Sequence, residues 1–227
     1  MSEAKMTDVI AIDGPAASGK STVARRVAEA MDARYVDSGA LYRAVAWRVL
    51  EAGVDPRDAD GVAAMVLGVR MDFVVDGKAV GFRVDDLSPG MALRAERVNQ
   101  AVSPVAANPA VRVRVTGWLR GMTALGSLVM EGRDIGTVVF PAAAHKFYLD
   151  ASPEVRAQRR HAEMAAAEAL TVDAVGASLT RRDQIDSRRA TAPLKIAQDA
   201  IVVDSSSLGI DEVVALVLAS VRKERGA

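Results

Sequence analysis

The sequence predicts an α/β protein in which a doubly wound parallel sheet carries helices on both faces. Short apolar segments rich in β-branched residues alternate with longer segments whose apolar residues recur at helical spacing. The expected strands cover residues 9–12, 34–36, 128–130, 146–149 and 200–203. A chain of 227 residues, half of them hydrophobic, is long enough to form one large domain of this class.

The first expected strand leads into a loop that fits the pattern G-x-x-x-x-G-K-[ST], and an amphipathic helix over 23–31 follows it. Glycine lets the backbone approach a phosphate group closely, and the start of a helix offers unpaired N–H groups. Lys20 can then reach the outer phosphates, and the Ser21 hydroxyl can bind Mg²⁺. We therefore expect the P-loop NTPase fold, with ATP and Mg²⁺ held by Gly14, Pro15, Ala16, Ala17, Ser18, Gly19, Lys20, Ser21 and Thr22.

Further helices follow in order along the chain. A helix over 40–50 comes after the second expected strand, with Ser38 as its N-cap. Two helices are expected between 93 and 124, separated either near Ser103-Pro104 or near Asn108-Pro109. Helices over 154–168, 172–187 and 210–223 complete the pattern.

A β-hairpin interrupts this alternation. Apolar residues recur at every second position on both sides of a tight turn at Asp76-Gly77. Because a hairpin is foreign to a parallel sheet, we interpret about 54–98 as a subdomain inserted into a single domain over 1–227. The core then covers about 1–53 and 99–227.

The charge balance and composition limit the class of partner. The chain has 29 Lys plus Arg and 29 Asp plus Glu, which argues against a nucleic acid or a membrane surface as partner. It has no cysteine, which excludes disulfides and thiolate metal sites. Residues 1–7 are polar, and no segment approaches the roughly 20 apolar residues of a membrane-spanning helix. We expect a cytoplasmic monomer.

Two groups of arginines lie near the expected carboxyl ends of the strands, where parallel sheets bind ligands. Arg156, Arg159 and Arg160 share one helical face, and either pair with neighbouring glutamates or bind a polyanion. Arg182, Asp186 and Arg189 share another face, as a surface ion-pair ladder or as a polyanion clamp. The crowding of further polar residues into the same turn favours the clamp, and phosphoryl transfer needs cations of this kind.

Several motifs together resemble those of bacterial cytidylate kinases of the long type, which carry an inserted nucleotide-binding subdomain. They are the loop over 14–22, Asp37-Ser38-Gly39-Ala40-Leu41-Tyr42-Arg43, Ser103-Pro104-Val105-Ala106-Ala107, Val111-Arg112, the run over 132–141 that begins Gly132-Arg133-Asp134, and the run over 182–189. The similarity extends almost from end to end. The phosphate loop alone is generic, whereas the Asp-Ser-Gly and Gly-Arg-Asp motifs together are specific.

The resemblance implies ATP-dependent phosphorylation of CMP and dCMP with Mg²⁺. Arg43 and Arg133 would hold the acceptor phosphate, and Arg182, Asp186 and Arg189 would engage the sugar and the transferring phosphate. Ser38, Tyr42, Ser103, Arg112 and Asp134 would complete the acceptor site around the base. Arg156 and Arg160 would belong to a lid over ATP at about 154–189, and the catalytic cations would be Lys20, Arg133, Arg160, Arg182 and Arg189.

Two alternatives stay open. One is a P-loop kinase for a different nucleotide or small metabolite, and the other is a regulatory module that binds nucleotide to control a partner. The sequence lacks the Asn-Lys-x-Asp signature of guanine-binding switches. Glu131 is a weak substitute for the Mg²⁺-binding aspartate of ATPase motors.

Overall fold

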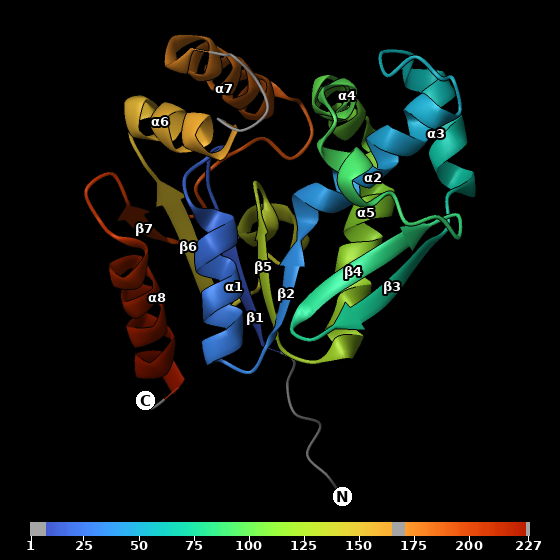
Figure 1. The fold of residues 1–227 in the computed structure, drawn as a ribbon. Coiled ribbons are helices and arrows are strands. Elements are labelled where there is room, and N and C mark those ends of the chain that lie inside the picture. Colours follow the sequence, from blue (N-terminus) through green and yellow to red (C-terminus); the bar gives the residue numbers. More distant parts are fainter. Residues whose placement is uncertain (1–7, 165–170, 226–227) are drawn as a thin grey trace, which may run out of the picture.

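A seven-stranded sheet forms the centre of the protein in a computed structural model that describes residues 8–164 and 171–225 (Figure 1). Its order is β3-β4-β2-β5-β1-β6-β7. Neighbouring strands are parallel except β3 and β4, which are antiparallel. The strands are β1 (Val9–Asp13), β2 (Arg34–Asp37), β3 (Met71–Asp76), β4 (Ala79–Val84), β5 (Leu128–Gly132), β6 (His145–Asp150) and β7 (Ile201–Asp204). The predicted fold class is confirmed.

The central strand β1 is buried on both faces. Because side chains alternate along a strand, Val9 and Ala11 join one apolar cluster, whereas Ile10 and Ile12 join the other. This explains why β1 is an uninterrupted apolar run in the sequence rather than an alternating one. Its last residue, Asp13, lies opposite Gly132 of β5 and Tyr148 of β6.

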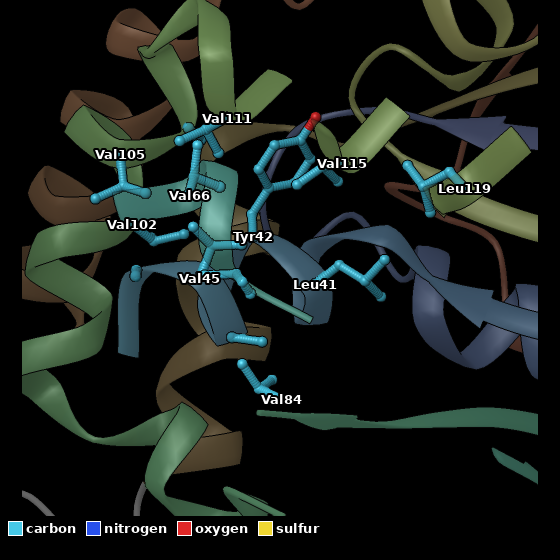
Figure 2. Close-up of a cluster of buried hydrophobic side chains, with 14 of the residues drawn as sticks. Leu41, Tyr42, Val45, Val66, Val84, Val102, Val105, Val111, Val115 and Leu119 are labelled. Atoms are coloured by element: carbon cyan, nitrogen blue, oxygen red, sulfur yellow. The ribbon is translucent and has the colours of Figure 1, made fainter. Parts of the chain in front are cut away.

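Helices cover both faces of the sheet. On one face α1 (Lys20–Ala30) packs beside α8 (Ile210–Arg225) over the second cluster. On the other face gather α2 (Ser38–Glu51), α3 (Ala59–Gly68), α4 (Glu96–Ala107) and α5 (Pro109–Gly121). Figure 2 shows how Tyr42 and Val45 of α2 meet Val105 of α4 and Val115 of α5. In Figure 1 the remaining helices, α6 (Pro153–Met164) and α7 (Val172–Arg188), lie beyond the carboxyl ends of the central strands.

The hairpin of β3 and β4 joins the edge of this same sheet. β4 pairs with β2 through Tyr35 and Ala79. The Tyr35 N–H donates to the Lys78 carbonyl at 2.7 Å, and Arg34 Nη1 donates to the Gly77 carbonyl at 2.6 Å. The expectation that the hairpin lies outside the sheet is therefore wrong. β4 pairs with β2 in the parallel direction, and β3 then adds to the free edge of β4 as an antiparallel strand. The division into a core and an inserted subdomain stays a prediction.

The helix boundaries follow local capping. The break between α4 and α5 falls at Asn108-Pro109, where the Asn108 side chain accepts from the Ala110 N–H at 3.0 Å and donates to the Ala59 carbonyl at 2.8 Å. Pro104 lies inside α4 without ending it. The structure begins α6 at Pro153 and describes it to Met164, so its predicted end at 165–168 lies outside the described residues.

Shortening a side chain should destabilise the protein where that side chain is buried in an apolar cluster, and not where it is exposed. Leu128 of β5 has no exposed surface, whereas Leu67 of α3 is 72% exposed. We expect Leu128→Ala to lower the free energy of unfolding by about 2–5 kcal/mol, because it leaves a cavity. The control Leu67→Ala should stay within about 0.5 kcal/mol of wild type. Urea unfolding followed by circular dichroism measures both, and equal losses would contradict this assignment of the core.

Candidate active site

The phosphate loop lies between β1 and α1 and is shaped by two glycines. Gly14 has φ +147°, and a Cβ there would meet the Leu149 carbonyl oxygen at 2.0 Å. Gly19 has φ +91°, which also favours glycine. The Lys20 side chain folds back over the loop, where Nζ donates to the Pro15 carbonyl at 2.5 Å and to Ser18 Oγ at 3.4 Å. The loop is thus preformed around its own lysine.

Lys20 is a buried cation short of negative charge. Burial lowers the pKa of its ammonium to about 7, and the nearby Arg133 guanidinium contributes to the shift. Glu131 and Asp13 act in the opposite direction but do not restore the ordinary value. A bound polyphosphate supplies the kind of charge that would do so.

Glu131 connects the phosphate loop to two neighbouring elements. Its carboxylate accepts from the Ser21 hydroxyl at 2.9 Å and from the Tyr35 hydroxyl at 2.5 Å. Its backbone carbonyl accepts from Ser38 Oγ at 2.7 Å. Burial raises the pKa of this carboxyl group, and nearby Asp37 adds to the effect. The predicted Mg²⁺ ligand Ser21 therefore lies beside a second hard oxygen donor.

Asp37, not Ser38, caps α2. The Asp37 carboxylate accepts from the Ala40 N–H at 2.9 Å and pairs with Arg43 at 3.0 Å. The prediction of Ser38 as the N-cap is wrong because its hydroxyl donates to the Glu131 carbonyl of β5 instead. Ser38 thereby ties the first turn of α2 to the strand that carries Glu131.

A buried ion pair joins α5 to the end of β5. Arg112 pairs with Asp134, and the two side chains are 3% and 4% exposed. The Arg112 guanidinium also lies over the Tyr42 ring, 5.1 Å from its centroid. Arg189 Nη2 approaches the same carboxylate at 3.7 Å. Ser103, predicted to join this group, lies partly buried on α4.

Asp186 lies at the centre of the second arginine group. It pairs with Arg133 Nε at 3.1 Å and with Arg189 Nη1 at 3.5 Å, and it is buried. The ladder of exposed charges is therefore excluded. Asp186 also acts on the charge of Arg182, and the ion pair with Arg133 adds a partner from a segment distant in sequence that helical spacing did not predict. Burial lowers the pKa of Arg182 to about 10, with Arg133 adding to the shift.

The three arginines of α6, Arg156, Arg159 and Arg160, have different partners and different degrees of burial. Arg156 is buried, pairs with Asp183 of α7 and donates to the Ala16 carbonyl at 3.3 Å. Arg159 donates to the Ser205 carbonyl at 2.7 Å. Arg160 pairs with Glu163 at 3.1 Å and is 40% exposed, so its role at ATP stays a prediction.

The chain is similar to known proteins along nearly its whole length. A family model described as cytidylate kinase matches residues 10–223. The chain belongs to the cytidylate kinase family. The cytidylate kinase of Mycobacterium leprae (strain Br4923) is 48% identical over 225 residues, which cover 98% of this chain and 99% of that protein. The cytidylate kinase of Thermus thermophilus is 47% identical over 220 residues, 96% and 100% of the two chains.

The solved structure of a gluconokinase from Sinorhizobium meliloti 1021 has a TM-score of 0.50 at 15% identity and covers 96% of this chain and 93% of its own. That likeness supports the fold alone. As a member of the cytidylate kinase family, the chain is a phosphotransferase.

Sequence reasoning about this cytidylate kinase family member missed two carboxylates. Asp183 accepts from the Ala16 N–H of the phosphate loop at 3.1 Å. Asp13 accepts from the Ile135 and Gly136 N–H groups at 2.9 and 2.7 Å. Asp13 directly precedes Gly14, and Asp183 lies within the 182–189 motif. Their positions in the sequence do not indicate which N–H groups their carboxylates bind, because those groups belong to distant segments.

A second feature lies outside the predicted site. A cavity of about 420 Å³ is lined by residues that include Gly136, Lys146 and Asp199. The Lys146 ammonium donates there to Asp199 and to the Pro141 carbonyl, each at 2.6 Å. No predicted site residue lines this cavity, although its lining residue Gly136 donates to Asp13 next to the phosphate loop. In the described part of the chain, no helix is both long and apolar enough to span a membrane.

The pKa of Lys20 predicts a pH-dependent penalty on the ligand-free protein. Its pKa falls from 10.5 to about 7 on folding. The unfolded chain therefore binds the proton more tightly, so the penalty is full below about pH 7 and fades as pH rises toward 10.5. We expect Lys20→Met to stabilise the protein most at pH 6 and progressively less at pH 7.5 and 9. Urea unfolding at the three pH values measures this, with the exposed Lys195→Met as control. A constant difference from wild type would contradict it.

Proposed function

We propose that this enzyme transfers the γ-phosphoryl group of ATP to the phosphate of CMP or dCMP, giving CDP or dCDP. The observation that carries the proposal is the position of Arg133. One guanidinium nitrogen donates to the Gly14 carbonyl of the phosphate loop at 2.9 Å, while another pairs with Asp186 in the second arginine group. Arg133 therefore connects the phosphate loop, which would hold the phosphoryl donor, to a set of buried cations. The name of the relatives, cytidylate kinase, indicates the acceptor.

The phosphate loop would hold ATP. Its N–H groups, Lys20 and the lid arginines Arg156 and Arg160 match the charge of a triphosphate. Mg²⁺ suits the hard oxygens of Ser21 and Glu131, which lie 2.9 Å apart. When bound, Mg²⁺ would neutralise charge on the phosphate oxygens.

The acceptor would bind on the side of Arg43 and Arg133, whose guanidiniums suit its phosphate. A cytosine edge presents an amino donor beside ring and carbonyl acceptors. Asp134 offers an acceptor beside the donors of Arg112, so this pair matches cytosine. Uracil would set a carbonyl against the Asp134 carboxylate. Ser38, Tyr42 and Ser103 would complete this side of the site.

Phosphoryl transfer here needs positioning and positive charge rather than a base. The attacking atom is a phosphate oxygen that is already ionised near neutral pH. Charge spreads over the transferring phosphoryl group in the transition state. We propose that Lys20, Arg133, Arg160, Arg182 and Arg189 balance that charge. The low pKa values of Lys20 and Arg182 support this, because the carboxylates near each group do not offset its burial and the charge of Arg133 in the ligand-free protein.

A panel of acceptors tests the proposed function. We expect wild type with ATP and Mg²⁺ to phosphorylate CMP and dCMP with a kcat/KM at least about tenfold above that for UMP, AMP and GMP. Lys20→Met, measured in parallel, should lose roughly 10²–10³ in rate, because one preorganised cation is removed. A preference for another monophosphate, or ATP hydrolysis that needs no acceptor, would contradict the proposal.

Asp186 provides a sharper test of the acceptor site. We expect Asp186→Ala to cost about 2 kcal/mol or more in kcat/KM, because Arg133 and Arg189 lose their buried partner. The loss should differ between CMP and dCMP, which differ by one sugar hydroxyl. Asp211→Ala removes an exposed carboxylate that pairs with Arg26, and should leave both values unchanged. Small, equal losses for the two acceptors would show that Asp186 only braces its helix.

A further inference from the structure

Asp13 is a buried carboxylate at the junction of the two halves of the site. It ends β1 and directly precedes Gly14, the first residue of the phosphate loop. Its Oδ1 accepts from the Ile135 N–H at 2.9 Å, and its Oδ2 accepts from the Gly136 N–H at 2.7 Å. These two amides open the π-helical turn Ile135–Val139, immediately after Arg133 and Asp134.

A second contact holds the other end of the same short segment. Arg133 Nη1 donates to the Gly14 carbonyl at 2.9 Å. The adjacent residues Asp13 and Gly14 thus form hydrogen bonds with the segment 133–136 on both sides of Asp134. The remaining Arg133 contact reaches Asp186 of α7 at 3.1 Å. The position of Arg133 relative to the phosphate loop is therefore set by two neighbouring residues of β1 and the loop.

The chemistry of this junction requires a carboxylate. Each of the two adjacent N–H groups meets its own oxygen here, and among side chains of this length only aspartate offers two acceptor oxygens. Burial raises the pKa of Asp13 to about 6, with Asp134 adding to the shift, while the two N–H groups and Lys20 favour the ionised form. Little room remains for a larger side chain: a Cβ on Gly136 would be in van der Waals contact with Asp13 Oδ2 at 3.4 Å and would lie 3.1 Å from Lys146 Cδ.

We propose that Asp13 is a positioning residue that fixes the segment Arg133–Gly136 against the phosphate loop, and so sets the distance between acceptor and donor. The inference rests on the proposed function, since it assigns Arg133 to the acceptor phosphate. In this role Asp13 acts through its contacts with Ile135 and Gly136 and needs no contact with either substrate. A small displacement of a positioned group can cost about 10²-fold in rate.

The first measurement compares Asp13→Asn with wild type. Asparagine keeps one acceptor oxygen and turns an NH₂ group toward the second amide, which repels it. We expect kcat/KM for CMP to fall at least about tenfold. The Kd of ATP, measured by calorimetry without acceptor, should rise much less than kcat/KM falls, because the Asp13 charge is one of several carboxylates acting on Lys20. Glu212→Gln makes the same carboxylate-to-amide change at a remote backbone N–H, that of Gly209 at 2.7 Å, and should leave both values unchanged.

A double-mutant cycle separates positioning from general destabilisation. If Asp13 acts through Arg133, then Asp13→Asn should cost at most about threefold in kcat/KM when Arg133→Ala is already present. Losses that multiply independently, or a wild-type kcat/KM for Asp13→Asn, would overturn the proposal. A rise in the Kd of ATP as large as the loss in kcat/KM would also overturn it.

A second variant tests the junction from its other side if Asp13→Asn does not fold. Gly136→Val extends a branched side chain beyond a Cβ that already contacts Asp13 and Lys146, and should lower kcat/KM for CMP at least about fivefold with the Kd of ATP unchanged. Wild-type kinetics for this variant would then overturn the proposal. Wild type that does not phosphorylate CMP would reject the proposed function itself. Active wild type with an unaffected Asp13 variant rejects only the role of Asp13.

Discussion

The burial of charge at the carboxyl end of the sheet is the constraint on which this molecule depends. Lys20, Arg112 and Arg156 are buried cations, and Glu131, Asp134 and Asp186 are buried carboxylates around them. An unpaired buried charge is costly, so each ion is stable only beside an ion of opposite sign or a backbone dipole. The fold meets this requirement by bringing β1, β5, α5 and α7 to one place. The same pairing leaves Lys20 and Arg182 short of anions, which is the property that a phosphate-binding site needs.

Much of the fold was predictable because local rules determine it. The run Val9–Ile12 signals a strand buried on both faces, and the glycine spacing of the phosphate loop signals a turn with positive φ. The edge position of the hairpin was not predictable, because it depends on one pair, Tyr35 with Ala79, between segments far apart in the chain. The sequence left two places for the break between α4 and α5. The structure has it at Asn108, whose side chain caps α5 by accepting from the Ala110 N–H.

The sequence predicted which residues form the candidate site but not which ion pairs and hydrogen bonds they make with one another. Helical spacing places Arg182, Asp186 and Arg189 near one another, yet spacing within one helix cannot indicate that Arg133 of a distant segment takes the ion pair with Asp186. The same limit applies to Asp13 and Asp183, whose partners are backbone amides elsewhere in the chain. Backbone partners leave no trace in residue type, which is why a carboxylate of this kind is easily overlooked in a sequence.

Gly14 limits how this sequence can change over time. Any side chain at that position would have to displace the Leu149 carbonyl, which a Cβ would meet at 2.0 Å. Leu149 belongs to β6, and its backbone is fixed by pairing with Val203 of β7. No single compensating substitution can open the space, because the obstacle is a main-chain atom that every residue type shares. A side chain at position 14 therefore requires the backbone of β6 to shift, a steric cost that exists independently of selection for any activity.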